Sequence, residues 1–245
     1  MHLPIMDMIR GECVFIVAMS FLTVLSIFAF MLVFIKAGFF DKLLVKYGFR
    51  KKRIGTNWTA FSWESCLAKL AYKADVVFFG DSLTRGGDFH KICKNSSVVN
   101  LGCSGDTLAG MIGRASTVQM LSPQKVFIMG GINGLTDYNV LTSVSTYEDL
   151  LESMEKLLPA AKFYIQGLLP LSAARARKLR CSNSAIVKYN EALKVLANKR
   201  GHIYIDLFSL YLRNGELDPE VTVEGLHLKP EGYERWYQAV EQYLH

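Results

Sequence analysis

A serine behind a short apolar run is the first residue of the chain whose type and position suggest chemistry. Ser82 follows the run 76–79, with Gly80 and Asp81 between them. A serine hydroxyl is a poor nucleophile until a neighbouring base takes its proton. At the end of a strand, where a helix begins, the hydroxyl is exposed and nearby backbone N–H groups could hold an oxyanion. The alternative is that Gly-Asp-Ser forms only a turn or a helix cap, and the tripeptide alone favours that reading.

The elements that must position this serine are visible from residue 61 onward as short apolar runs that alternate with amphipathic segments. The runs are rich in β-branched and aromatic residues, which is typical of buried strands. Expected strands are 75–79, 98–101, 125–129, 162–166 and 202–205, and expected helices are 106–120, 145–158, 183–199 and 231–244. The alternation predicts an α/β fold of three layers, α/β/α, around a five-stranded parallel sheet.

Polar and glycine-rich segments follow three of the expected strands, at 80–83, 102–107 and 130–134. In parallel sheets with helices on both faces, sites form beyond the carboxyl ends of the strands. We therefore expect an active site at this edge, with Ser82 within it.

Four short blocks, in order along the chain, resemble the blocks of the SGNH, or GDSL, hydrolase family. They are GDSLT at 80–84, NLGCSGDT at 100–107, GIN at 131–133 and EGLH at 224–227, the last followed by Gly232-Tyr233. The resemblance covers the chain from about residue 75 to its end. It implies the flavodoxin-like SGNH hydrolase fold, which agrees with the pattern of elements.

The resemblance also implies roles for single residues. Ser82 would attack an ester carbonyl, and His227 would take the serine proton and pass it to the leaving alcohol. The backbone N–H groups of Ser82 and Gly105 and the side-chain amide of Asn133 would form the oxyanion hole. Asp81 would be structural, and the chemistry would need neither a cofactor nor a metal.

Two positions depart from the family pattern. The triad acid is normally Asp, and Glu224 stands in its place, so the loop must accommodate one more methylene. Gly134 replaces an Asp that commonly follows the Asn of the third block. If Glu224 does not reach the histidine, Asp218 is the nearest other carboxylate upstream, or the site is a Ser–His dyad.

Other reactive residues are weaker candidates. His90 is near Ser82 in sequence but is expected on a surface helix or loop, and Cys103 is expected to be a packing residue near the oxyanion hole. Ser104 is not in a G-x-S-x-G motif, because Asp106 occupies the fifth place. The five cysteines form no CxxC or CxxH spacing, so neither a disulfide framework nor a zinc site is indicated.

A basic cluster follows the fourth expected strand. It consists of Arg175, Arg177, Lys178 and Arg180, which we refer to as the 175–180 cluster. A solvated helix or loop face is the favoured interpretation. Contact with an acidic substrate or a membrane surface is the alternative.

An uncharged apolar segment lies near the start of the chain, at residues 13–35. As a helix it would reach roughly 35 Å, enough to cross a hydrocarbon core of about 30 Å. Because only Arg10 precedes the segment as a basic residue and no A-x-A follows it, an uncleaved membrane anchor is favoured over a signal peptide. The expected organisation is a tail at 1–12, an anchor at 13–35, a juxtamembrane linker at 36–60 and a hydrolase domain at 61–245.

The net charge of +6 is concentrated directly after this segment. Residues 36–53 hold seven basic residues and one acidic residue, which accounts for the whole excess. The positive-inside rule then favours a single-pass protein with a cytoplasmic catalytic domain, although the opposite face stays open. A basic stripe with interleaved aromatics is lacking, so we expect no nucleic-acid partner.

The sequence thus predicts a membrane-anchored serine esterase. The expected substrates are small acyl esters, either O-acetyl carbohydrates or lysophospholipid-like lipids. An O-acyltransferase with the same triad is an alternative that sequence alone does not separate from the esterase. A non-catalytic binding protein on the same frame is a further alternative, against which the joint presence of Ser82, Asn133 and His227 argues. The oligomeric state is not predicted.

Overall fold

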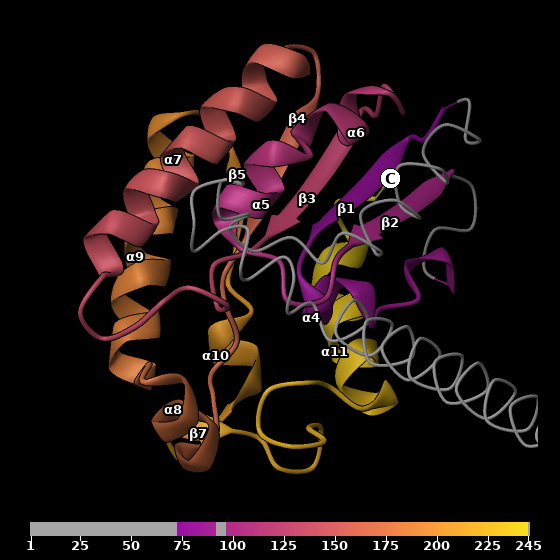
Figure 1. The fold of residues 1–245 in the computed structure, drawn as a ribbon. Helices are drawn as coiled ribbons and strands as arrows, with labels where there is room; N and C mark the ends of the chain where they lie inside the picture. The colour runs from indigo at the N-terminus through magenta and orange to yellow at the C-terminus, as the bar shows by residue number, and fades with distance from the viewer. Residues whose placement is uncertain (1–72, 92–96, 245) are drawn as a thin grey trace, which may run out of the picture. The chain divides into compact units, whose positions relative to one another are not determined.

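The computed structural model describes residues 73–91 and 97–244 of the chain. Five strands form one parallel sheet: β1 (Val76–Gly80), β2 (Val98–Gly102), β3 (Lys125–Met129), β4 (Lys162–Gln166) and β5 (Ile203–Ile205). Their order across the sheet is β2-β1-β3-β4-β5 (Figure 1). The predicted α/β class and the five-stranded parallel sheet are confirmed.

Residues 1–72 lie outside the described part, and so do the predicted anchor at 13–35 and the predicted linker at 36–60. Among the residues that are described, no helix has both the length and the apolar character needed to span a membrane.

Helices connect the strands and cover both faces of the sheet (Figure 1). The longer helices are α5 (Leu108–Gly113), α6 (Ala115–Gln119), α7 (Val140–Leu157), α8 (Ala173–Leu179), α9 (Asn183–Lys199) and α11 (Pro230–Glu241). Helices α5, α6, α7 and α9 pack against one another. Helix α11 packs on the opposite face, where Trp236 donates a hydrogen bond to the Gln166 side chain at 2.6 Å and stacks edge-on against Phe89.

Shorter elements complete the described part. They are α4 (Ser82–Arg85), the 3-10 turn η1 (Phe89–Lys91), α10 (Phe208–Tyr211) and a hairpin of β6 (Leu212–Arg213) with β7 (Glu216–Leu217).

Stacked aromatic rings tie the central strands together. Phe78, Phe127 and Tyr164 occupy adjacent register positions on β1, β3 and β4, and their ring centroids are 4.6 and 4.4 Å apart. Phe89 stacks on Phe78 from η1. Such cross-strand contacts and the burial of whole strands fix the register, because a slip of one residue would turn every ring to the other face.

That register sets the edge where a site can form. Gly80, at the end of β1, is level with Gly102 of β2 and Met129 of β3. The segments that follow these three strands therefore start side by side.

Several predicted boundaries change. The single helix expected over 106–120 is two helices. The helix is interrupted at Arg114, whose side chain is buried in the core. Helix α7 begins at Val140, five residues before the predicted start. Helix α8 and the β6–β7 hairpin were not predicted as elements.

Candidate active site

Ser82 lies at the junction between β1 and α4. It is the first residue of α4, and Asp81 caps the helix by accepting a hydrogen bond from the Leu83 N–H at 3.0 Å. The Ser82 residue is partly exposed, whereas Asp81 is fully buried. Burial raises the pKa of Asp81 to about 6, although the Leu83 N–H opposes this shift. The buried Asp81 thus fixes the start of α4, and Ser82 beside it stays partly exposed.

His227 reaches this hydroxyl across 145 positions of sequence. The Ser82 Oγ lies 3.0 Å from His227 Nε2, and His227 Nδ1 lies 2.5 Å from Glu224 Oε1. A carboxylate accepts hydrogen bonds, so Nδ1 carries the proton and Nε2 can accept the proton of the serine. The three residues form a chain of contacts from hydroxyl to imidazole to carboxylate.

Glu224 is turned toward the imidazole by a bond to its own loop. Its Oε2 accepts the His227 backbone N–H at 3.2 Å, while Oε1 faces the ring. Burial acts to raise the pKa of Glu224, but hydrogen bonds and the charge of His227, with a contribution from Arg175, leave this pKa below its ordinary value. The extra methylene of Glu relative to Asp is accommodated by this folded-back conformation.

Asp218, the alternative acid, is engaged elsewhere. Its carboxylate pairs with Arg235 at 2.8 Å and with Arg213 at 3.4 Å. These partners lower the pKa of Asp218, with the Arg235 hydrogen bond as the first cause. The structure therefore places Glu224, and not Asp218, against His227.

The loop that carries Glu224 and His227 is closed by its own backbone. Thr222 Oγ1 donates to the His227 carbonyl at 2.8 Å and accepts the Gly225 N–H at 3.0 Å. The Val223 N–H also donates to the His227 carbonyl, at 2.9 Å. These bonds close the turn over residues 222–227, which carries the side chains of Glu224 and His227.

The predicted oxyanion donors follow β2 and β3. Gly105 is exposed. The Asn133 Nδ2 donates to the Asp106 carbonyl at 2.8 Å. The amide nitrogen carries two hydrogens, and this bond uses one. Asp106 is adjacent to Gly105, so the bond links the two segments that hold the predicted donors.

A buried arginine that sequence reasoning missed supports this arrangement. The Arg114 side chain is 1% exposed and donates to the Asp106 carboxylate at 2.6 Å. It also donates to the carbonyls of Leu101 at 2.7 Å and Gly80 at 2.8 Å, and it lies 4.3 Å from the Phe79 ring centre. One side chain therefore joins the ends of β1 and β2 to the second block. Asp106 precedes α5 and Arg114 follows it, so no spacing within one helix relates the two residues and the sequence gives no local signal.

The 175–180 cluster divides into two parts. Arg177, Lys178 and Arg180 are exposed on or directly after α8. Arg175 instead points inward and bonds Glu224 Oε1 at 2.5 Å. The predicted solvated face holds for the first three and not for Arg175.

The two weaker candidates differ in their exposure. His90 is exposed in the η1 turn, and Cys103 is fully buried directly after β2. Within residues 73–91 and 97–244, no group of His, Cys, Asp and Glu is arranged to hold a metal ion.

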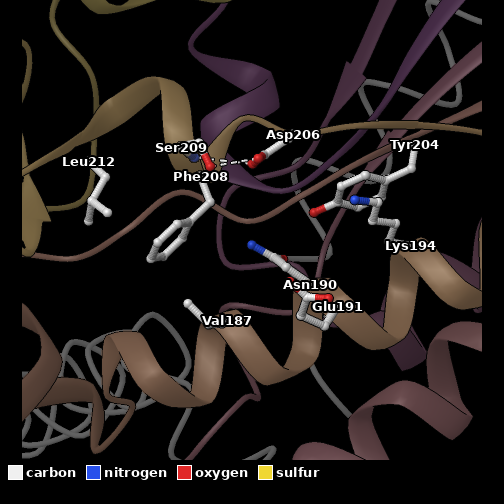
Figure 2. A pocket seen from close by; sticks show the side chains of 9 residues that line it. All are labelled: Val187, Asn190, Glu191, Lys194, Tyr204, Asp206, Phe208, Ser209 and Leu212. Carbon is white, nitrogen blue, oxygen red and sulfur yellow. Dashed lines mark hydrogen bonds between the residues drawn. The ribbon is translucent and has the colours of Figure 1, made fainter.

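Two hollows lie near the carboxyl end of the sheet and the histidine loop. One, of about 220 Å³, is lined by α9 and the segment after β5, with Glu191, Lys194 and Asp206 among its lining residues (Figure 2). In it the Ser209 hydroxyl donates to the Asp206 carboxylate at 2.6 Å. Ser82, His227 and Glu224 do not line this hollow. The other, of about 600 Å³, borders the histidine loop at Thr222 and Gly225.

Comparison with known proteins identifies a family pattern over most of the described part. The model of the GDSL-like lipase/acylhydrolase family matches residues 78–235. A comparison with curated proteins found no match.

Solved structures share the fold at low sequence identity. A protein from Streptococcus pneumonia, provisionally described as a platelet activating factor, is 19% identical with a TM-score of 0.69, covering 86% of this chain and 99% of that one. A provisionally described acylhydrolase from Bacteroides fragilis is 22% identical with a TM-score of 0.67, over 77% and 97% of the two chains. A GDSL-like lipase from Bacteroides thetaiotaomicron is 21% identical with a TM-score of 0.64, also over 77% and 97%.

Proposed function

Since the chain belongs to the GDSL-like lipase/acylhydrolase family and is a carboxylic ester hydrolase, we propose that Ser82, His227 and Glu224 perform the reaction. The observation that carries this proposal is the Ser82 Oγ to His227 Nε2 contact of 3.0 Å, continued by the 2.5 Å contact to Glu224. It pairs a nucleophile with a base, and the base with a group that orients it.

The proposed reaction has two acyl-transfer steps. His227 Nε2 takes the Ser82 proton as the serine oxygen bonds to the ester carbonyl carbon. The tetrahedral intermediate collapses when the bond to the alcohol oxygen breaks, and His227 returns the proton to that oxygen. Water then attacks the acyl-serine with the same proton transfers, which releases the carboxylic acid and restores Ser82.

The donors proposed for the oxyanion are the N–H groups of Ser82 and Gly105 and the amide of Asn133. The level ends of β1, β2 and β3 bring their segments together, and the Asp106 carbonyl holds one Asn133 hydrogen. A donor held in place before the reaction stabilises developing charge without having to reorganise.

For the substrate we propose a lysophospholipid-like lipid before an O-acetyl carbohydrate. Apolar side chains are exposed close in sequence to the candidate residues. Tyr138, just before α7, and Leu141, in the first turn of α7, are 93% and 85% exposed, and Val223, next to Glu224, is 69% exposed. Exposed apolar groups near a site fit an ester with a hydrocarbon part.

We also propose that residues 13–35 anchor the enzyme in a membrane, with the catalytic domain on the cytoplasmic side. The support is the uncharged apolar segment and the basic residues that follow it. Deletion of residues 1–35 should move the enzyme from the membrane fraction to the soluble fraction, and an unchanged distribution would contradict the anchor.

The test of the reaction is hydrolysis of a short-chain p-nitrophenyl ester by the full chain in detergent. We expect Ser82→Ala to lower kcat by roughly 10⁴-fold or more while the protein stays folded. Unchanged turnover in this variant would contradict the mechanism. The same preparation, offered a lysophospholipid and an acetylated sugar separately, ranks the substrates. Transfer of the acyl group to an added sugar in preference to water would instead indicate an acyltransferase.

A further inference from the structure

Arg175 bonds the same carboxylate oxygen that contacts the histidine. Its guanidinium lies 2.5 Å from Glu224 Oε1, and His227 Nδ1 lies 2.5 Å from that atom. The Arg175 side chain is only 16% exposed, whereas Arg177, two residues further along α8, is exposed. Of the two arginines, Arg175 thus binds the proposed triad acid, Glu224.

The start of α8 is fixed to the loop that carries Glu224. The Ser172 N–H donates to the Gly225 carbonyl at 3.1 Å, and the Ala173 N–H donates to Glu216 in the hairpin at 2.7 Å. Gly225 has a φ of +84°, and a Cβ at that position would lie 1.9 Å from Ser172 Oγ. The N-cap residue of α8, three residues before Arg175, therefore lies directly against the turn that carries Glu224 and His227.

A glutamate needs more restraint than an aspartate in this position. Its side chain has one more rotatable bond, and fixing that bond costs conformational entropy. Glu224 Oε2 is held by the His227 N–H, and Oε1 is held by Arg175. Hydrogen bonds between charged groups are shorter and stronger than neutral ones, so the arginine limits the carboxylate to the rotamer that faces the ring.

We propose that Arg175 is a positioning residue of the hydrolase site, which acts on Ser82 only through Glu224 and His227. The inference deepens the proposed function and rests on it, since it assumes that His227 activates Ser82. Arg175 does not touch the substrate in this role. It compensates for the change from Asp to Glu in the triad.

The first measurement compares two arginines of one helix. The rate of Ser82 phosphonylation by a fluorophosphonate and the kcat for a p-nitrophenyl ester are measured in Arg175→Met and in Arg177→Met. We expect Arg175→Met to lower both by about 10–100-fold, by analogy with the loss seen when the hydrogen-bond partner that orients a metal-binding side chain is removed. Arg177→Met should stay within about twofold, because surface changes have small effects. Wild-type rates in Arg175→Met would overturn the proposal.

The second measurement asks whether Arg175 acts through Glu224. In Glu224→Ala the arginine has no carboxylate to hold, so adding Arg175→Met should change the rate by less than about twofold. A loss as large in that background as in the wild type would overturn the proposal, because it would show an independent effect. A substrate-binding arginine would raise KM, whereas a positioning residue lowers kcat with KM within about twofold of wild type.

Two controls separate the possible failures. If circular dichroism shows that Arg175→Met does not fold, Arg175→Lys is measured in its place. We expect Arg175→Lys to lower the labelling rate and kcat in the wild-type background and to leave both unchanged in the Glu224→Ala background. Any other result overturns the proposal. If the fluorophosphonate labels Ser82 of the wild type but no ester is hydrolysed, the proposed function fails. The labelling rates of the Arg175 variants then still test whether Arg175 is a positioning residue. If Ser82 does not label at all, both fail.

Discussion

The two halves of the candidate site are built in different ways. The nucleophile half consists of Ser82, Gly105 and Asn133, which follow three strands whose ends are level in one sheet. Buried bonds support it, including those of Arg114, whose side chain is 1% exposed. The base half is a loop whose two working side chains, His227 and Glu224, are 43% and 34% exposed.

The difference lies in what fixes each position. Residues at strand ends take their places from the register of the sheet, which the whole core holds. The base half depends on a few hydrogen bonds within one turn and on contacts from α8. A longer carboxylate can be accommodated there because two of its partners, Arg175 and the His227 ring, are side chains that can adjust. We therefore expect changes in the nucleophile half to remove chemistry, and changes in the base half, His227 itself excepted, to alter geometry.

The largest effect that sharpens this comparison is expected from Asn133. Asn133→Ala removes a proposed oxyanion donor and should lower kcat by about 10²–10³-fold in the ester assay. Asn133→Asp is the matched variant, because it keeps the shape of the side chain but has no N–H group. Near-normal kcat in Asn133→Asp would show that Asn133 is not a donor.

An intermediate effect is expected from two glycines on the base side. Gly225 and Gly215 have φ values of +84° and +83°, but a Cβ at Gly225 would strike Ser172, whereas nothing lies within 4 Å at Gly215. Alanine at either position costs about 1–2 kcal/mol of backbone strain. Only Gly225→Ala should also displace Glu224 and lower kcat, by about tenfold or more. Equal kcat values for the two variants, with similar melting temperatures, would break the proposed link between α8 and the triad.

The last effect concerns the stability of the nucleophile half and not its rate. Burial raises the pKa of Asp81 from 3.8 to about 6, so the folded protein holds this proton more tightly than the unfolded chain. As the pH rises from 4 to 7, ionisation of Asp81 should lower the free energy of unfolding by about 2–3 kcal/mol. Asp81→Asn keeps a capping oxygen and should lack this loss. Parallel stability curves for the two proteins in urea unfolding would contradict the shift.

The nucleophile half was largely predictable from the sequence. Short buried runs between turn residues predicted β1 to β5 to within one residue at each end, because such runs have few alternatives. Because parallel strands end at the same edge of a sheet, the segments after the first three strands were expected to meet there, and the family resemblance assigned roles to Ser82, Gly105 and Asn133. The spacing of Glu224 and His227 predicted their proximity to each other, but only the folded chain brings them to Ser82.

The residues that support the site were not predictable in the same way. Residues 106–120 continue a helical pattern through Arg114, and the partners that turn this side chain inward are carbonyls of two strands. The segment of α8 has the composition of a solvated helix. Arg175 meets Glu224 across 49 positions, and a contact of that separation leaves no periodic signal.

The contact between Ser82 and His227 is tested most directly by mapping a fluorophosphonate adduct on the full chain by mass spectrometry. Only a serine whose proton can be removed by a neighbouring base reacts readily. The geometry predicts one adduct, on Ser82, that disappears in His227→Ala. An adduct on another residue, or a Ser82 adduct that forms equally well without His227, would contradict it.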